Sequence, residues 1–124
     1  MKEDKIQQQI IAYLSFMARK HNFIYYSPMN EAAMMIMRRL RVPQKTVSIM
    51  MSWMGKMGFL PGVSDIIIGH MGKMYCMELK TEVGTQSKNQ ILFEANCNKT
   101  FIEYKVVRSL DECINQLRLW GIVQ

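Results

Sequence analysis

The sequence predicts an α/β protein in which a small mixed β-sheet is flanked by helices. Two observations predict this class. Apolar residues recur at helical spacing near both ends of the chain, and segments rich in β-branched and aromatic residues lie between them. Turn residues and helix-capping motifs separate these segments. At 124 residues the chain is expected to form a single domain, residues 1–124.

The first half of the chain is expected to be mostly helical. Its predicted elements are a helix ending near Met17, a strand over 21–26 and helices over 31–41 and 44–57. Ile6, Ile10 and Leu14 share one helical face, and aromatic residues dominate the predicted strand. Pro43 follows the second helix and Gly58 closes the third.

The second half alternates strands with helices. Its predicted elements are strands over 64–69, 73–80 and 102–108, a helix running from Ser87 to about Cys97 and a last helix after Ser109. Pro61-Gly62 is a turn signal, and the isoleucine run after it is typical of a strand. Ser87 and Ser109 each begin a capping-box motif, with Gln90 and Glu112 three residues later.

Composition excludes several classes of protein. No apolar run approaches the roughly 20 residues that a membrane span requires. The three cysteines form no CxxC pair, and neither histidine has zinc-ligand spacing from a cysteine. A disulfide framework, a structural zinc site and a Cys-His nucleophile are therefore not expected. We expect an intracellular protein whose cysteines are buried free thiols.

The positive charge is concentrated in the first half of the chain. The net charge is +6, and between Ile6 and Ser64 seven basic residues stand against Glu31 alone. This asymmetry indicates an anionic partner, and nucleic acid is the candidate. The residues predicted to contact it are Arg19, Lys20, Arg38, Arg39, Arg41 and Lys45.

Three charged residues lie where the two central strands are predicted to pair. If Met71-Gly72 forms a two-residue turn, Asp65 lies directly opposite Glu78. If the loop has four residues, Asp65 opposes Cys76 instead. Because side chains alternate along a strand, either loop places Asp65, Glu78 and Lys80 on one face of the sheet.

Two carboxylates that face each other repel unless a cation lies between them or one holds a proton. Such oxygen ligands suit Mg²⁺ or Mn²⁺, and a neighbouring ammonium stabilises negative charge that develops on a phosphate. The three groups together indicate metal-assisted phosphodiester hydrolysis. On spacing alone, an ordinary Glu–Lys pair at a solvent-facing strand end remains the alternative, because Glu-x-Lys is a weak motif.

An ordered set of motifs resembles the VRR-NUC (virus-type replication-repair nuclease) family of the PD-(D/E)XK nuclease superfamily. Its members in this chain are Pro61-Gly62-Val63-Ser64-Asp65, Glu78-Leu79-Lys80, Gln90, Glu3-x-x-Ile6-Gln7 and Val106-Val107-Arg108-Ser109. The resemblance implies a restriction-endonuclease-like core. It also implies that Asp65, Glu78 and the backbone carbonyl of Leu79 ligate Mg²⁺ or Mn²⁺, and that Lys80 serves the attacking water.

The resemblance implies two further catalytic residues, each of which also has a structural explanation. Glu3 would be the acidic residue of the first helix, but acids also stabilise a helix N-terminus. Gln90 would position the lysine, a water or the metal shell, but it is also the partner of Ser87 in a capping box.

The function implied by the resemblance is a divalent-metal-dependent DNA endonuclease. Stand-alone members of the family are phage or bacterial proteins that resemble homodimeric, structure-selective nucleases, so the expected substrate is branched DNA such as a Holliday junction. A role in DNA repair, in the cytoplasm of a bacterium or a phage-infected host cell, is expected. The alternatives are a non-catalytic DNA-binding module of the same fold and an assembly protein built on the methionine-rich segment 29–57, which holds eight of the thirteen methionines.

Overall fold

The computed structural model describes residues 2–28 and 30–124, apart from the side chains of residues 30 and 31. Within them the elements are α1 (Glu3–Met17), β1 (Phe23–Tyr26), α2 (Asn30–Arg39), α3 (Gln44–Lys56), β2 (Ile66–His70), β3 (Lys73–Leu79), α4 (Lys88–Lys99), β4 (Glu103–Val107) and α5 (Leu110–Leu119). The order of elements predicted from the sequence is confirmed, with ends that differ by a few residues. No helix in this part of the chain has the length and apolar character required to cross a membrane.

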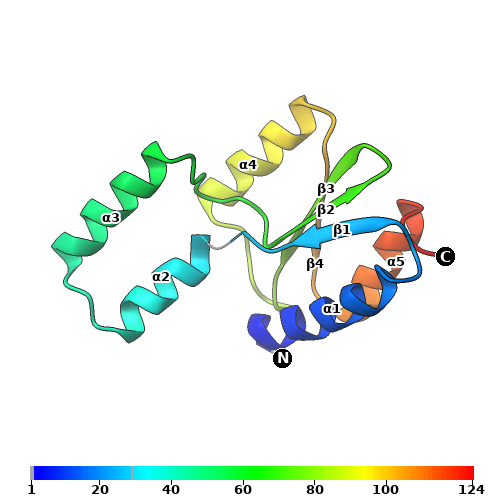
Figure 1. Ribbon diagram of the computed structural model, residues 1–124, viewed down its shortest axis with the longest axis horizontal. Helices are drawn as coiled ribbons and strands as arrows, with labels where there is room; N and C mark the ends of the chain where they lie inside the picture. Colours follow the sequence, from blue (N-terminus) through cyan, green and yellow to red (C-terminus); the bar gives the residue numbers. More distant parts are fainter. Residues whose placement is uncertain (1, 29) are drawn as a thin grey trace.

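The four strands form one mixed sheet in the order β1-β2-β3-β4. The pairs β1–β2 and β2–β3 are antiparallel, whereas β3 and β4 run parallel. Figure 1 shows α4 on one side of this sheet and α1 with α5 on the other. A small mixed sheet flanked by helices is the predicted α/β class, which the structure confirms.

Both faces of the central strands are buried, which explains the uninterrupted isoleucines of β2. Ile66 and Ile68 pack with α1 and α5 in the larger apolar cluster. Ile67 points the other way and packs with Cys76, Phe93 and Cys97 beneath α4. This second face is the one that carries the charged residues predicted for the site, because Ile67 and residue 65 lie on the same side of the strand.

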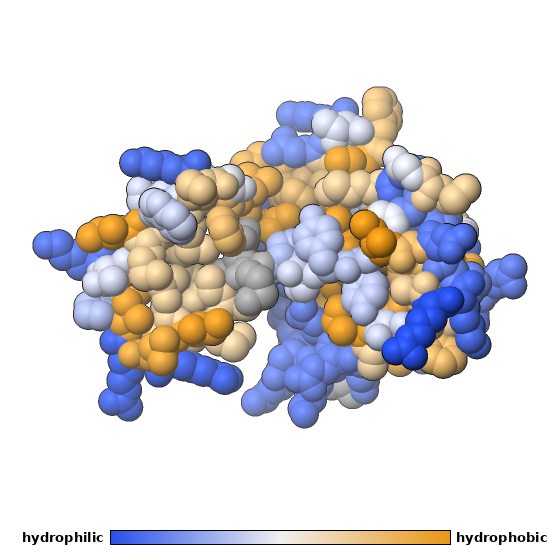
Figure 2. All heavy atoms as spheres, in the orientation of Figure 1, coloured by the Kyte–Doolittle hydropathy of each residue, from blue (hydrophilic) through white to orange (hydrophobic). Residues whose placement is uncertain are grey.

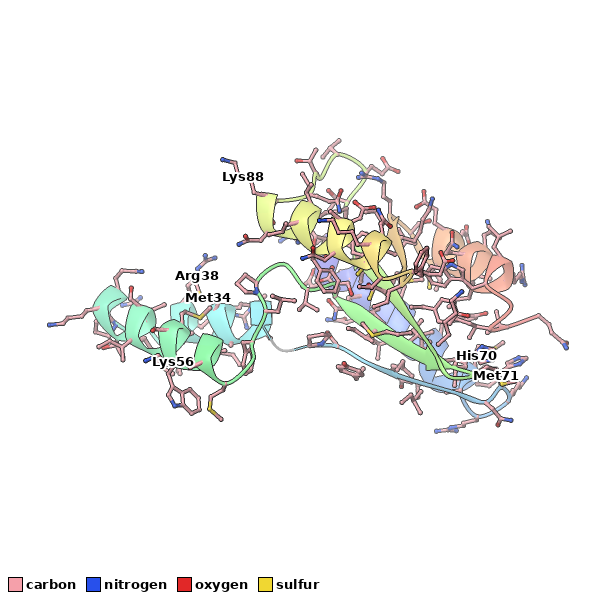
Figure 3. All side chains as sticks on the ribbon, turned by 90° about the horizontal axis from the view of Figure 1, so that it is seen from above. Met34, Arg38, Lys56, His70, Met71 and Lys88 are labelled. Atoms are coloured by element: carbon pink, nitrogen blue, oxygen red, sulfur yellow. The ribbon has the colours of Figure 1, made fainter. Side chains whose placement is uncertain are left out.

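The helices α2 and α3 form an arm, residues 30–57, that projects from the sheet (Figures 1 and 3). Its buried side chains, Met37, Val47 and Met54, belong to neither cluster around the sheet. Met35, Met50 and Met57 are exposed. The methionine-rich segment is therefore partly a small core of its own and partly open surface, and Met29 lies outside the described residues.

The two capping motifs behave differently. Ser87 and Gln90 form the complete predicted box at the start of α4. At α5 the Ser109 hydroxyl accepts from the Glu112 amide, as predicted. The Glu112 carboxylate, however, accepts from the Arg108 amide at 2.8 Å, one residue before the expected donor. The two side chains at this helix start thus accept hydrogen bonds from the backbone N–H groups of Arg108 and Glu112, a span one residue longer than in a standard capping box.

Candidate active site at the open end of the β2–β3 hairpin

The hairpin turn places Asp65 and Glu78 opposite each other. Met71 and Gly72 form a two-residue turn with φ values of 51° and 76°, the positive pair expected of a primed hairpin turn. His70 pairs with Lys73, and the register continues to Ile66 and Met77. One further step sets Asp65 against Glu78, so the shorter of the two loops considered from the sequence is the one present.

A hydrogen bond fixes the orientation of the Asp65 carboxylate. Its Oδ2 accepts from the backbone N–H of Leu79 at 2.8 Å. The next residue, Lys80, donates its N–H to the carbonyl of Val107 on the opposite side, at 3.0 Å. Because the N–H and C=O of one strand residue point to the same side, the Leu79 carbonyl faces the side on which Asp65 lies. The Asp65 carboxylate and the Leu79 carbonyl therefore lie on the same side of β3, and the register places the Glu78 side chain on the same face of the sheet as Asp65.

Glu78 and Lys80 do not face solvent. Glu78 is 0% exposed and Lys80 is 8% exposed. Because burial of a charge is costly without compensation, ionisable groups seldom occupy such positions unless they are paired or bind a ligand. The alternative of an ordinary Glu–Lys pair at a solvent-facing strand end does not describe these residues.

The turn that leads into β2 is docked on the start of α4. Gly62 has a φ of +82°, and a Cβ at this position would overlap the backbone of Asn89 and lie 2.7 Å from the Gln90 nitrogen. Only glycine permits so close an approach in this conformation. Ser64, buried after this turn, donates its hydroxyl to the Ile66 carbonyl at 3.2 Å. These contacts bring the segment that carries Asp65 next to the one that carries Gln90.

Gln90 is firmly engaged at the helix start. Its side-chain Oε1 accepts from the backbone N–H of Ser87 at 2.8 Å, while the backbone N–H of Gln90 donates to the Ser87 hydroxyl at 3.2 Å. The side chain is 4% exposed. The capping function is thus confirmed, and a part in catalysis stays a prediction.

Glu3 lies in the first turn of α1, which packs on the opposite face of the sheet from Glu78. Within residues 2–28 and 30–124 no three side chains of the histidine, cysteine or acidic type gather into a group that could hold a metal ion. Glu3 therefore does not form such a group with Asp65 and Glu78. A catalytic role for Glu3 stays a prediction that the geometry does not support.

A hydrogen-bonded trio beside the carboxylates was not anticipated from the sequence. The Gln86 amide donates to the Tyr104 hydroxyl and to the Glu94 carboxylate, both at 3.1 Å. Burial raises the pKa of Tyr104, and the negative charges of Glu78, Glu94 and Asp65 raise it further, against the opposing effect of the Gln86 bond. The phenol therefore remains a neutral donor close to both candidate ligands. No local motif signals this trio, since its members come from the loop before α4, from α4 and from β4.

Arg108 holds the loop that joins Lys80 to α4. Its Nη1 donates to the carbonyls of Thr81 at 2.6 Å, Glu82 at 3.3 Å and Gly84 at 2.8 Å. A pocket of about 440 Å³ opens between this loop, α1 and the start of α5. The guanidinium thus ties the end of β4 to the backbone that follows the candidate lysine.

The six basic residues predicted to contact nucleic acid form two separate groups. Arg19 and Lys20 follow α1 and precede Phe23, which pairs with His70 at the turn end of the sheet. They lie a full strand length from Asp65. The other four are exposed on the arm, near the loop between its two helices: Arg38, Arg39, Arg41 and Lys45. Figure 3 shows Arg38 on the arm and Met71 at the opposite end of the molecule.

The donor set suits a hard divalent cation. Two carboxylates and a backbone carbonyl are the oxygen ligands that Mg²⁺ and Mn²⁺ prefer, with remaining positions left for water or phosphate oxygens. Comparisons of the chain with protein-family models, with curated proteins and with solved structures find no match. The likeness to VRR-NUC nucleases accordingly stays a prediction from the motifs.

Proposed function

We propose that this protein is a divalent-metal-dependent endonuclease that hydrolyses phosphodiester bonds in DNA. The observation that carries the proposal is the convergence of Asp65, Glu78 and Lys80 on one face at the open end of the hairpin. Two of the three groups are buried, a position that a charged residue seldom occupies without a ligand or partner. The positive charge of the arm is complementary to the negative charge of the DNA backbone.

Asp65, Glu78 and the Leu79 carbonyl would hold the metal ion. When bound, Mg²⁺ or Mn²⁺ supplies Lewis-acid polarisation of a phosphoryl oxygen and makes water a stronger nucleophile at neutral pH. The Leu79 amide keeps the Asp65 carboxylate in place, so this ligand requires little rearrangement. Lys80 orients the attacking water and offsets the charge that develops on the phosphate.

The arm and a second copy of the chain complete the proposal. Arg38, Arg39, Arg41 and Lys45 would contact the phosphates that flank the cut. Two copies related by a two-fold axis would present two sites to two strands of a branched junction, so we propose a homodimer acting on Holliday-junction or other branched DNA in repair. Equilibrium sedimentation tests the dimer directly.

The deciding assay incubates the protein with labelled junction, flap and linear duplex DNA in the presence of Mg²⁺, Mn²⁺ or a chelator. Cutting is expected with metal and not with chelator. Asp65→Ala and Glu78→Ala should each abolish cutting while the variants still bind DNA. Glu103→Ala is the matched control, because Glu103 is a half-exposed carboxylate of the same sheet that pairs with Lys73. Cutting that survives at both Asp65→Ala and Glu78→Ala would refute the assignment of the site.

Two further measurements separate catalysis from binding. Lys80→Met should lower the turnover rate by about 10²–10⁴, the usual contribution of a group that assists proton transfer, while Lys73→Met should not. Arg38→Ala combined with Arg39→Ala should reduce the salt dependence of binding by a slope of about 1.8, at about 0.9 for each lost phosphate contact. A protein that binds DNA with this salt dependence but never cuts with any metal would be the non-catalytic module instead.

A further inference from the structure

The face of the sheet that carries Asp65 is left open along its β1 edge. Helix α4 covers Ile67 and Cys76, but Ile24 and Tyr26 of β1 are 71% and 56% exposed. Tyr26 pairs with Ile67, so their side chains lie side by side on this face. Ile67 is two residues from Asp65 on the same side of the chain, a separation of roughly 7 Å. An apolar strip therefore begins beside the candidate metal ligands.

Tyr26 and the segment after α3 enclose a pocket of about 450 Å³ on this strip. Its lining includes two aromatic rings from distant parts of the chain, Tyr26 and Phe59, together with Leu60 and Val63. Phe59 and Leu60 are 38% and 51% exposed, so the pocket opens to solvent. The lining is largely apolar, and the hydroxyl of Ser27 in it accepts a hydrogen bond from the side-chain amide of Gln7 at 3.1 Å.

The arm that leads to the pocket is basic. The arm ends at this pocket, where the exposed Lys56 precedes the lining residue Met57, and it carries four more exposed cations near its outer loop. Figure 2 shows its surface as a mixture of apolar and strongly hydrophilic residues. The sequence of the arm contains one acidic residue, Glu31, against five basic ones. An apolar partner alone would not require such a charge pattern, whereas a nucleic-acid strand requires both an aromatic surface and cations.

We propose that this pocket receives one unstacked nucleobase of the strand that is cut. The inference rests on the proposed function and extends it to the choice of substrate. The rings of Tyr26 and Phe59 stack on the base, while the arm contacts the phosphates on either side of it. The nucleotide concerned lies close to the cleaved phosphate, because Ile67 adjoins both the pocket and Asp65. DNA with an unpaired nucleotide next to the cut is thus the preferred substrate.

The test measures affinity alone, in an Asp65→Ala background so that no strand is cut. Two labelled junctions are compared by fluorescence anisotropy; they are identical except that one has an unpaired base beside the crossover and the other an abasic residue. The unpaired base should bind about tenfold more tightly, within the range that stacking of one base on an aromatic ring supplies. Tyr26→Leu and Phe59→Leu, which keep apolar volume but remove the ring, should each reduce this preference severalfold.

Phe101→Ala is the matched control, since Phe101 is an exposed ring, 89% accessible, in the α4–β4 connection. It should leave the preference intact. Equal affinity for the two junctions in the parent protein would overturn the base pocket while leaving the proposed nuclease standing. An absence of DNA affinity would overturn both. A dimer that Tyr26→Leu and Phe59→Leu dissociate, with the base preference unchanged, would reassign the pocket to a second copy of this chain.

Discussion

Replacing Gly62 by alanine tests how the turn before Asp65 is docked on α4. Two penalties add at this position. The φ of +82° disfavours any residue with a Cβ, at a cost of about 1–2 kcal/mol. The new methyl group would also overlap the backbone of Asn89 and Gln90, and forcing extra volume into a packed site costs about 1–3 kcal/mol. The expected loss in the free energy of unfolding is therefore about 2–5 kcal/mol.

Gly72→Ala provides the control for this experiment. Gly72 has a nearly equal φ of +76°, but nothing lies within 4 Å of a Cβ built on it. It should lose only the conformational part, about 1–2 kcal/mol. The benefit of alanine in the unfolded chain is common to both variants and cancels in their difference.

Urea unfolding measured by circular dichroism gives the comparison. At about 4 °C per kcal/mol for a chain of this length, Gly62→Ala should also lower Tm by roughly 8–20 °C and Gly72→Ala by roughly 4–8 °C. Equal losses in the two variants would refute the reasoning, because they would show that the turn moves away from α4 without cost. Close docking of residues 61–65 on the helix would then not be a requirement of the fold.

Three further predictions concern other contacts of the same framework. Arg108→Lys should speed amide hydrogen exchange in residues 81–84 and lower the free energy of unfolding by about 1–2 kcal/mol, because a lysine does not reproduce the bonds of one guanidinium to three carbonyls. Unchanged exchange in these residues would contradict this prediction. Ser87→Ala should lower the free energy of unfolding by about 1 kcal/mol in urea, and Ser52→Ala, an exposed serine inside α3, should cost clearly less. Burial raises the pKa of the Cys97 and Cys113 thiols from 9.0 to about 12, so between these values the unfolded chain releases protons that the folded chain keeps. The free energy of unfolding should therefore be unaffected below pH 9 and fall as the pH rises toward 12. Cys113→Ala should flatten this decline when urea unfolding is measured at a series of alkaline pH values.

The sheet could largely be predicted because its signals are local. The two-residue turn at Met71-Gly72 determines the register of the hairpin, and strand alternation then determines which side chains share a face. The complete capping box at Ser87 likewise needs only four consecutive residues. The parallel pairing of β3 with β4 leaves no comparable local signal, since its partners are brought together by a helix in between.

The candidate site was predictable to the same extent. Asp65, Glu78 and Lys80 follow from the hairpin. Tyr104 feels the charges of Asp65 and Glu78 only because of where β4 lies, and Gln86 is bonded to Tyr104 from the loop before α4. The positions of the basic residues in the fold could not be predicted in this way. They lie in the same half of the sequence, but Arg19 precedes Phe23, which pairs with His70 at the far end of the sheet from Asp65. Charge counted along a sequence gives no information on such separations.

The excursion of the chain through the arm joins two strands that are already neighbours. The chain leaves the sheet after Tyr26 and returns at Ile66, and Tyr26 pairs with Ile67, so exit and re-entry points nearly coincide. A segment with adjacent ends can lengthen, shorten or be exchanged at little entropic cost to the remainder. Residues 30–57 are thus a replaceable module: a different insert in their place would change the surface beside the sheet, while the sheet and the turn before Asp65 keep their contacts.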